Sequence, residues 1–258
     1  MAEGSVTAGD GSAPDVTGSV GSAVSWGAFS FVDSVPGVAA ALASGLAWVC
    51  LDEQHGRWDD ARVLAALDAS SPGPGRILVR VPSLDDGLIG RALDAGAHGV
   101  IVPMVESVAQ AEAAVAAVRY PPAGRRSFGP IAAPHGAPAD TAAANAANLC
   151  AVMIETAAAL EAVEEIAAVP GVDLLFVGPF DLSLALGTDV DALLADGGAG
   201  PLGRVVAAAE AGGIRAGAFA GTPDRARRMA ELGFTFIAAT TDVDVVERGL
   251  SAVLSQLS

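Results

Sequence analysis

The sequence predicts a single-domain α/β fold, a (β/α)8 TIM barrel, and three observations favour this fold class. The chain has 258 residues, and one such barrel typically needs about 250. From Trp26 onward, short apolar runs bounded by Gly, Pro or Asp alternate with alanine-rich helical stretches in eight strand–helix units. The runs are apolar along almost their whole length, which is typical of parallel strands covered by helices. Eight units favour a closed barrel over an open sheet.

The barrel domain is expected over residues 24–258, after a segment without apolar periodicity. Residues 1–23 are rich in Gly, Ser, Ala, Thr and Asp, so they cannot bury enough surface to offset the entropy of ordering them. We expect a disordered N-terminal lead. The barrel strands are expected, in chain order, at Gly27–Val32, Trp48–Asp52, Ile77–Val81, Gly99–Pro103, Ala151–Glu155, Leu174–Val177, Arg215–Phe219 and Phe234–Ala239.

Helix signals fall between these runs. Pro36 opens the first helix and Gly96 closes the third, in line with the preference for proline at helix starts and glycine after helix ends. The connection Tyr120–Leu149 holds several prolines and little periodicity, and long barrel loops of this kind usually carry function. The helices are expected at Pro36–Ser44, Asp59–Ala69, Asp85–Ala95, Val108–Arg119, Ala157–Ala168, Val205–Ala211, Pro223–Leu232 and Val243–Leu257.

Charge and composition exclude several classes of partner. The formal net charge is −16, which repels nucleic acid and anionic membranes. No apolar run approaches the roughly 20 residues that span a bilayer, and the N-terminus lacks the basic flank and apolar core of a secretory signal. The two cysteines, Cys50 and Cys150, lie far apart without a metal-type spacing. We expect a soluble cytoplasmic protein with both thiols buried and no nucleic-acid or membrane partner.

All 14 basic residues are arginines, and the chain contains no lysine. A Schiff-base aldolase, a pyridoxal-phosphate enzyme and a P-loop NTPase each need a lysine amine, as nucleophile, cofactor anchor or phosphate ligand. The missing lysine excludes all three mechanisms. A dinucleotide-binding function also has little support, because no Gly-x-Gly-x-x-Gly turn follows the first expected strand.

Polar residues at the carboxyl ends of the expected strands are the candidate functional residues, because barrel enzymes assemble their active sites there. We expect the side chains at these positions to converge on one rim. Asp52 and His55 stand at or just after the end of the second strand, and Arg80 stands near the end of the third. Glu155 ends the fifth strand, and Asp181 follows the sixth.

Glu155 and Asp181 are the candidate metal ligands. They follow adjacent expected strands, so their carboxylates could share a divalent cation, and hard oxygen ligands favour Mg²⁺ or Mn²⁺. Two protein ligands leave coordination positions open. A 2-oxo acid could chelate the cation there, and the cation would act as a Lewis acid for an enolate. In the alternative interpretation, each acidic residue merely caps or starts the following helix.

His55 is the candidate base of this rim. Asp52 lies three residues earlier, where a turn could let it hydrogen-bond one ring nitrogen, fix the tautomer and raise the basicity. Such a dyad could take a proton from a substrate hydroxyl, although a single loop histidine is also compatible with a plain surface residue. His98 precedes the fourth strand at the opposite end of the barrel and is expected to be structural. The sequence does not decide whether His135, in the long loop, reaches the site or a neighbouring subunit.

Arg80 ends an otherwise apolar run, where burial without an anionic partner would be costly. It is suited to an enolate or carboxylate oxygen of a substrate. The alternative is a structural ion pair with Glu53, Asp52 or Glu155. The backbone amides of the turn Gly178–Asp181, which leads into a helix, are expected to form a second cradle for a substrate carboxylate.

Several motifs follow one another along the chain: Asp52-Glu53-Gln54-His55-Gly56, Arg80-Val81-Pro82, Asp94-Ala95-Gly96-Ala97-His98-Gly99-Val100-Ile101-Val102-Pro103, Tyr120-Pro121-Pro122-Ala123-Gly124-Arg125-Arg126, Ile154-Glu155-Thr156 and Gly178-Pro179-Phe180-Asp181-Leu182-Ser183. Taken jointly and in this order, they are highly specific. From about Trp26 to the C-terminus, the chain resembles the HpcH/HpaI aldolase/citrate lyase family, specifically its metal-dependent class II pyruvate aldolase branch.

The resemblance implies an aldehyde-lyase that reversibly cleaves 4-hydroxy-2-oxo acids to pyruvate and an aldehyde. It implies a divalent cofactor, Mg²⁺, Mn²⁺ or Co²⁺, on Glu155 and Asp181, proton transfer by His55 with Asp52, and stabilisation of the pyruvate enolate by Arg80. The substrate-binding residues would be Arg80 and the turn residues Gly178, Pro179 and Asp181. It also implies a homo-oligomer, commonly a hexamer built as a trimer of dimers that exchange their last helix.

Two alternatives to this activity are kept. One is a related enolate lyase that decarboxylates or adds to a 2-oxo acid in a biosynthetic pathway, or that acts on an acyl-CoA ester. An acyl-CoA ester would need a basic groove, for which Arg125 and Arg126 are the candidates. The other is a non-catalytic barrel that binds a 2-oxo acid.

The chain departs from the family pattern beside the candidate site. Gln54 stands where a glutamate is common, and Met153 stands where a glutamine is common two residues before Glu155. Ser127 replaces a frequent glycine, and Thr240-Thr241-Asp242 replaces the usual Gly-Ser-Asp. We expect catalysis to survive these changes while substrate orientation or metal preference differs, and the sequence does not name the aldehyde.

Overall fold

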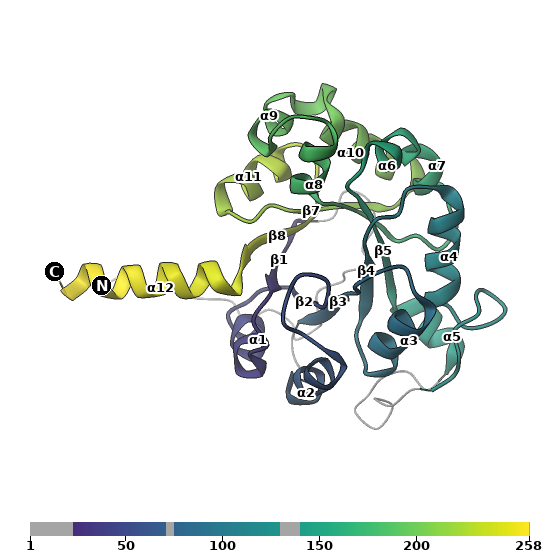
Figure 1. Ribbon diagram of the computed structural model, residues 1–258, viewed down its shortest axis with the longest axis horizontal. Helices are drawn as coiled ribbons and strands as arrows, with labels where there is room; N and C mark the ends of the chain where they lie inside the picture. Colours follow the sequence, from purple (N-terminus) through teal and green to yellow (C-terminus); the bar gives the residue numbers. More distant parts are fainter. Residues whose placement is uncertain (1–22, 71–74, 130–139, 258) are drawn as a thin grey trace.

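The computed structural model describes residues 23–70, 75–129 and 140–257. Eight parallel strands close into one barrel in chain order, and helices surround it (Figure 1). The predicted (β/α)8 barrel is confirmed. The expected disordered lead, apart from its last residue, and His135 lie outside the described residues. The strands are β1 Ser25–Ser30, β2 Trp48–Asp52, β3 Arg76–Arg80, β4 Gly99–Val102, β5 Leu149–Ile154, β6 Leu174–Val177, β7 Arg215–Phe219 and β8 Phe236–Thr241.

The largest differences from the expected strand ends occur in β1, β5 and β8. β1 begins at Ser25, which pairs with Phe236, and β8 runs on to Thr241, which pairs with Phe29. β5 begins at Leu149, two residues earlier than expected. Backbone groups of the neighbouring strand supply the hydrogen bonds of a ladder, so the polar Ser25 and Thr241 extend these strands against the apolar pattern.

The helices keep their expected order but are more divided than expected. The stretch expected as one helix over Ala157–Ala168 breaks at Ala162, and the helix expected from Val205 already begins at Pro201. The short helices α5 and α9 were not expected, because seven residues or fewer are too few to show an apolar period. The helix expected after the turn at Gly178–Asp181 is α8. The helices are α1 Val35–Ala43, α2 Asp60–Ser70, α3 Asp86–Asp94, α4 Val108–Val118, α5 Thr141–Ala147, α6 Ala157–Glu161, α7 Val163–Ala167, α8 Pro179–Ala185, α9 Val190–Ala195, α10 Pro201–Gly212, α11 Pro223–Glu231 and α12 Asp242–Leu257, with a 3-10 turn at Gly197–Ala199.

Aromatic side chains fill the barrel interior. Trp48 stacks on Phe236 with ring centroids 4.1 Å apart. Gly27 makes room for this stack, because a Cβ at that position would lie 2.1 Å from the indole ring. The remaining interior side chains are Phe29, Cys50, Leu78, Ile101, Leu149, Ala151, Met153, Leu174, Phe176 and Ala238.

A larger apolar core lies between the outer face of the barrel and the helices. Cys150 belongs to this layer, whereas Cys50 faces the interior, and both are free and buried as expected. Burial raises the pKa of the Cys50 thiol well above its usual range and that of Cys150 to about 12. Neither cysteine is therefore a thiolate nucleophile at neutral pH.

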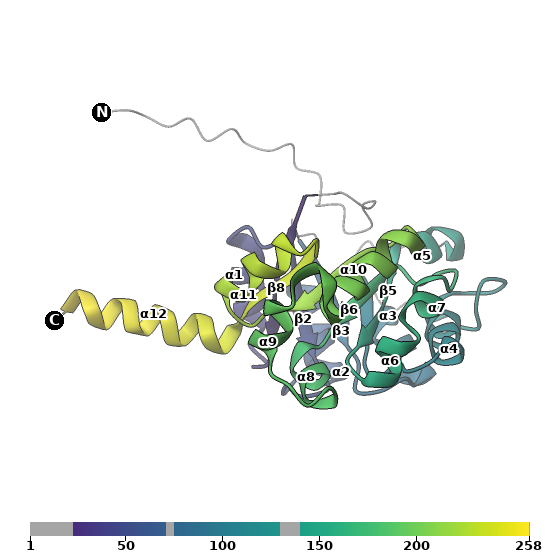
Figure 2. The same ribbon diagram turned by 90° about the horizontal axis from the view of Figure 1, so that it is seen from above.

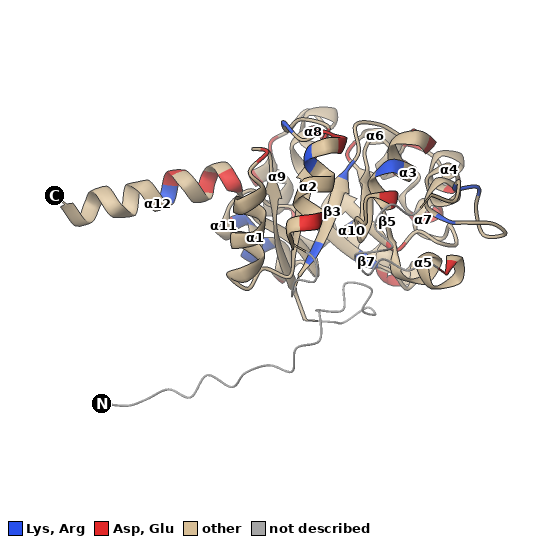
Figure 3. Cartoon of the chain, turned by 90° about the horizontal axis from the view of Figure 1, so that it is seen from below, with Lys and Arg blue, Asp and Glu red and all other residues tan. Residues whose placement is uncertain are grey.

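The last helix, α12, extends away from the barrel instead of packing on it (Figures 1 and 2). None of its residues over Asp242–Leu257 is buried. Its charges lie in the half nearer the barrel, as Figure 3 shows. Within the described ranges, no helix is both long and apolar enough to cross a membrane.

Candidate active site

Strand alternation brings three charged side chains to the carboxyl end of the barrel. Cys50, Leu78 and Met153 face the barrel interior. Because side chains of a strand alternate between its two faces, the residue two positions after each of these also faces the interior. These residues are Asp52, Arg80 and Glu155, and they are 0%, 7% and 2% exposed. These three residues of the predicted rim therefore form a cluster of buried charges on a floor of apolar side chains.

Arg80 and Asp52 form a bidentate ion pair. Arg80 Nε lies 2.8 Å from Asp52 Oδ1, and Arg80 Nη2 lies 2.6 Å from Asp52 Oδ2. The Arg80 guanidinium also stacks over the Phe29 ring, with Cζ 5.2 Å from the ring centroid. Burial disfavours the guanidinium charge, but the hydrogen bond and charge of Asp52 outweigh it, so the pKa of Arg80 lies above its usual value. The ion pair between Arg80 and Asp52, which the sequence offered as an alternative to a substrate contact of Arg80, is present.

The predicted hydrogen bond between Asp52 and the imidazole of His55 is not among the contacts of the described residues. Asp52 Oδ1 instead accepts from the backbone N–H groups of Gln54 at 3.1 Å and His55 at 3.4 Å. Arg80 takes both carboxylate oxygens because a planar guanidinium matches a carboxylate better than one ring nitrogen does. Asp52 thus fixes the backbone of the His55 turn, while the His55 side chain is exposed.

A close backbone approach tightens the same turn. A Cβ on Gly56 would lie 2.2 Å from the carbonyl oxygen of Asp52. The glycine after His55 is therefore a steric requirement, and the turn folds back over the end of β2.

Glu155 is held at the rim by the backbone of Met104. Glu155 Oε1 accepts the Met104 N–H at 2.7 Å. Burial raises the pKa of Glu155 and the charge of Asp181 adds to this, whereas the Met104 N–H and Arg80 oppose it. Met104 has a φ of +55°, a left-handed conformation that L side chains rarely adopt. Sequence reasoning missed this residue, because a methionine after a strand carries no signal of positive φ.

Gly178, directly after the next strand, lies against Glu155, and Asp181 follows in the first turn of α8. Gly178 caps α8, and a Cβ at this position would lie 2.6 Å from Glu155 Oε2. Pro179 occupies the first turn of α8, as does Asp181, whose side chain is exposed. The absent Cβ of Gly178 keeps open the space beside the Glu155 carboxylate.

This arrangement fits a divalent cation held by few protein ligands. Glu155 and Asp181 offer carboxylate oxygens, which are the ligands that hard cations prefer. Among the described residues, no group of three or more His, Cys, Asp or Glu side chains is placed to hold a metal ion. Two carboxylates would therefore leave most of the coordination sphere to a ligand and water.

Aromatic side chains wall the rim on the side of β1, β7 and α8. The ring centroids of Phe31 and Phe219 lie 6.4 Å apart, and those of Phe180 and Phe219 lie 6.0 Å apart. Arg225 lies over Phe180, with Cζ 5.7 Å from the ring centroid. Sequence reasoning did not single these aromatics out, although Phe31 and Phe219 stand at expected strand ends, which was the available signal.

Other candidates from the sequence lie elsewhere. Nδ1 of His98 accepts the Ile77 N–H at 3.1 Å at the opposite end of the barrel, where a structural role was expected, and burial lowers its pKa. Arg125 pairs with Asp86 at 2.5 Å, and Arg126 pairs with Asp94 at 2.6 Å. These two arginines, the candidates for the basic groove of the acyl-CoA alternative, are thus each paired with a carboxylate of α3.

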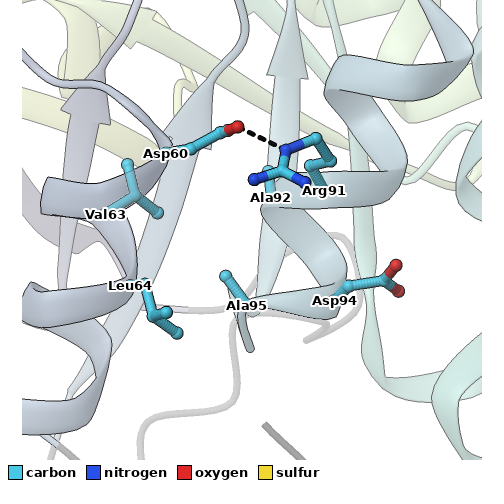
Figure 4. Close-up of a pocket in the computed structure, with 7 residues that line it drawn as sticks. All are labelled: Asp60, Val63, Leu64, Arg91, Ala92, Asp94 and Ala95. Carbon is cyan, nitrogen blue, oxygen red and sulfur yellow. Dashed lines mark hydrogen bonds and ion pairs between the residues drawn. The ribbon is translucent and has the colours of Figure 1, made fainter. Parts of the chain in front are cut away.

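A small pocket lies between α2 and α3 on the outside of the barrel. The Asp60–Arg91 ion pair crosses it, and Asp94 points away from it (Figure 4). Its lining contains none of the rim residues, so it is separate from the candidate site. The lining residues are Asp60, Val63, Leu64, Arg91, Ala92, Asp94 and Ala95.

Comparisons with known proteins agree with this geometry. The family model described as HpcH/HpaI aldolase/citrate lyase matches residues 29–248. A hydroxypyruvate/pyruvate aldolase from Paraburkholderia phytofirmans is 40% identical over 229 residues, which cover 85% of this chain and 88% of that protein.

Two solved structures have the same fold. A protein of this family from Burkholderia cenocepacia J2315 gives a TM-score of 0.82 at 32% identity and covers 91% of this chain and 95% of its own. The citrate synthase SbnG gives a TM-score of 0.76 at 25% identity, with 91% and 93% covered. This chain belongs to the HpcH/HpaI aldolase/citrate lyase family.

Proposed function

We propose that this protein is a metal-dependent aldolase that reversibly cleaves 4-hydroxy-2-oxo acids to pyruvate and an aldehyde. The observation that carries the proposal is the buried Glu155 carboxylate, which lies beside Asp181 and within the electrostatic reach of Arg80 at the barrel mouth. The similarity to a hydroxypyruvate/pyruvate aldolase supports the reaction class. The sequence excludes the competing lysine mechanism, because the chain has no lysine.

Glu155 and Asp181 would hold the cofactor, a divalent cation such as Mg²⁺, Mn²⁺ or Co²⁺. When bound, the cation supplies Lewis-acid stabilisation of negative charge on the oxygens of a 2-oxo acid. The Oε2 side of Glu155, where Gly178 has no Cβ, is where the ligand set would form. With Pro179 and Asp181, Gly178 would also line the place of the substrate carboxylate.

Arg80 is the fixed positive charge of the site. Its Nε and Nη2 are engaged by Asp52, which leaves Nη1 to donate to a substrate oxygen. Asp52 and the Phe29 ring hold the guanidinium plane in place before substrate arrives. A preoriented donor of this kind stabilises the enolate oxygen that develops when the carbon–carbon bond breaks.

His55 is the proposed base, and the exposed position of its ring at the mouth suits contact with a substrate hydroxyl. In the cleavage direction, His55 takes the proton of the C4 hydroxyl, the C3–C4 bond breaks, and its electron pair passes to the enolate of pyruvate. The C4 carbon leaves as the aldehyde. Return of a proton to C3 completes pyruvate, and the reverse sequence forms the bond.

The test is incubation of the protein with pyruvate, a panel of aldehydes and each of the three cations. Adducts are sought by mass spectrometry, and deuterium exchange at C3 of pyruvate reports enolate formation. We expect metal-dependent adducts and exchange with the unchanged protein and neither with Glu155→Gln. If neither reaction appears with any cation, the proposal is wrong.

A second candidate is an enolate lyase that uses another electrophile or decarboxylates a 2-oxo acid. The likeness to the citrate synthase SbnG favours it, and the departures Gln54 and Met153 lie where substrate orientation would change. Incubation with oxaloacetate and 2-oxo acid acceptors distinguishes the two, since turnover there without aldehyde adducts would favour this reaction. A non-catalytic binder would show ligand-induced stabilisation that Glu155→Ala abolishes, with no turnover.

We further infer that α12 docks on a second copy of the chain. Apolar side chains recur on it at alternating spacings of three and four residues, which places them on one stripe. All are exposed on a helix without buried residues. An oligomer, expected to be a hexamer arranged as a trimer of dimers, would cover them, and light scattering of Leu250→Asp beside the unchanged protein tests this. The stripe comprises Val243, Val246, Leu250, Val253 and Leu257.

We also propose the binding partners of the protein and its location in the cell. The partners are the small 2-oxo acid and the aldehyde, without nucleic acid or membrane. A cytoplasmic location agrees with two free, buried cysteines. Fractionation of the native cells with antibody detection tests this location.

A further inference from the structure

Asp242, the first residue of α12, is a carboxylate that binds the end of a different strand. Its Oδ2 accepts the Ser30 hydroxyl at 2.7 Å and the Val32 N–H at 2.9 Å. Its Oδ1 accepts the Phe31 N–H at 3.0 Å and the N–H of its neighbour Val243 at 2.9 Å. Across the described part of the chain, none of its partners is an arginine, so four neutral donors hold this charge.

The same end of β1 also holds the turn that carries His55. The carbonyl oxygen of Phe31 accepts the Arg57 N–H at 2.8 Å. The Ser30 hydroxyl oxygen, which donates to Asp242, accepts the indole N–H of Trp58 at 3.2 Å. The peptide of Phe31 and the hydroxyl of Ser30 thus each bridge Asp242 to the segment that immediately follows His55.

The His55 turn is therefore fixed from both sides. On its amino-terminal side, Asp52 accepts the backbone N–H groups of Gln54 and His55. On its carboxyl-terminal side, Arg57 and Trp58 bind the end of β1. Loss of either anchor would free the backbone on one side of His55 and widen the range of positions of its ring.

We propose that Asp242 is a positioning residue for His55. Its carboxylate orders Ser30 and Phe31, and these in turn order Arg57 and Trp58 beside the base. Because Asp242 also begins α12, one carboxylate links the orientation of the protruding helix to the catalytic turn. The catalytic part of this inference rests on the proposed function of His55, whereas its structural part does not.

The variants are Asp242→Asn, which keeps the size but has one acceptor oxygen, and Asp242→Ala. Asp244→Asn is the matched control, because Asp244 lies in the same first turn and carries the same charge. Amide hydrogen exchange over residues 54–58 is followed by mass spectrometry in the protein without substrate. We expect exchange there to be about 10-fold faster in Asp242→Asn and unchanged in Asp244→Asn. Unchanged exchange in Asp242→Asn, with α12 still attached and folded, overturns the proposal.

Kinetics test the catalytic part by a double-mutant cycle. Asp242→Asn should lower kcat for cleavage about 10-fold while the KM and the inhibition constant of oxalate, an analogue of the enolate, change by less than about 2-fold. In a His55→Ala background, Asp242→Asn should cause no further loss, because there is no base left to position. An equal loss in both backgrounds would overturn positioning through His55. If the unchanged protein cleaves no 4-hydroxy-2-oxo acid, the proposed function fails, and the exchange measurement still decides the structural link.

Discussion

The two ends of the barrel each hold an arginine–aspartate pair, and the pairs differ in whether backbone carbonyls also bind the arginine. At the amino-terminal end, Arg119 Nη2 binds Asp173 at 2.7 Å and the Gly171 carbonyl at 3.1 Å, and Nη1 binds the Asn148 carbonyl. Asp173 also accepts the Cys150 N–H at 2.7 Å.

At the carboxyl end, Arg80 is engaged by Asp52 alone among the described hydrogen-bonding groups, and Nη1 remains. Glu155 beside it is buried with a raised pKa and one oxygen facing the gap above Gly178. Backbone carbonyls that bind a guanidinium beside its carboxylate mark a structural pair, whereas a guanidinium bound by one carboxylate and next to a second buried carboxylate marks a site for a ligand.

The largest expected effect is the loss of turnover when Glu155, at the carboxyl end, is replaced by its amide. Glu155→Gln keeps the acceptor for the Met104 N–H but loses the charge that a cation needs, so turnover should fall about 10³-fold. Its melting temperature should not fall, because the raised pKa of Glu155 shows that its buried charge is disfavoured. Activity assays and calorimetry check both parts. A stable Glu155→Gln variant with full activity would contradict the assignment of the site.

The same substitution at Asp173 is the control for the amino-terminal end. Asp173→Asn leaves Arg119 without its counter-charge, so the free energy of unfolding should fall by about 2 kcal/mol. The activity per folded molecule should stay within about 2-fold, because the site lies at the other end. Loss of activity without loss of stability would show that the two ends do not divide the roles in this way.

An arginine-to-lysine exchange is expected to give a smaller but equally selective effect. Lysine cannot make the bidentate bond to Asp52 and still donate to a substrate. Arg80→Lys should therefore lower kcat about 10²-fold with a modest change in stability. Arg119→Lys should lower the melting temperature and spare kcat, and the reverse pattern would contradict the comparison.

The fold and the identity of the rim residues could be predicted from the sequence, because strand alternation and barrel topology decide both. Cys50 and Asp52, or Met153 and Glu155, must share a face whatever surrounds them. The partner of Asp52 could not be predicted, because local spacing favours His55, whereas the barrel brings Arg80 beside Asp52 by strand pairing. Met104 and Asp242 also escaped prediction, since their roles depend on backbone groups distant in the sequence.

Stability should depend on pH through Glu53, at the edge of the His55 turn. Burial, with the nearby charges of Asp60 and Asp59, raises the pKa of Glu53 from 4.5 to about 7. The folded protein keeps this proton where the unfolded chain has lost it, so the stability contribution is fully present below about pH 4.5 and is lost as the pH rises through 7. Because Glu53 is partly exposed, solvent screening reduces its contribution to the free energy of unfolding.

Glu53→Gln should therefore raise the free energy of unfolding by about 1 kcal/mol at pH 8, after allowance for solvent screening, and should have no such effect at pH 4.5. Chemical denaturation at both pH values measures this difference. Glu112→Gln on α4, an exposed position, serves as the control. An equal effect of Glu53→Gln at the two pH values would contradict the shift.

Backbone strain at the carboxyl rim falls on a residue other than glycine. Positive φ falls on glycines at amino-terminal turns, such as Gly45, Gly96 and Gly233, and on Gly221 after β7, whereas Met104 adopts it without being glycine. Glycine relieves that conformation but gains freedom in the unfolded chain, so Met104→Gly should change the free energy of unfolding by less than about 1 kcal/mol and retain activity within a few-fold.

Met104→Val tests whether the left-handed backbone at Met104 is needed for its N–H to bind Glu155. A β-branched residue resists positive φ, so this variant should lose about 1 to 2 kcal/mol of stability. It should also lose metal affinity, because the N–H that orients Glu155 would move. Calorimetry and Mn²⁺ titration check the pair. If the valine and glycine variants behave alike, the left-handed backbone at Met104 is not what holds Glu155. The side chain of Met104, a residue that is half exposed at the mouth, would then explain why a methionine stands at this position.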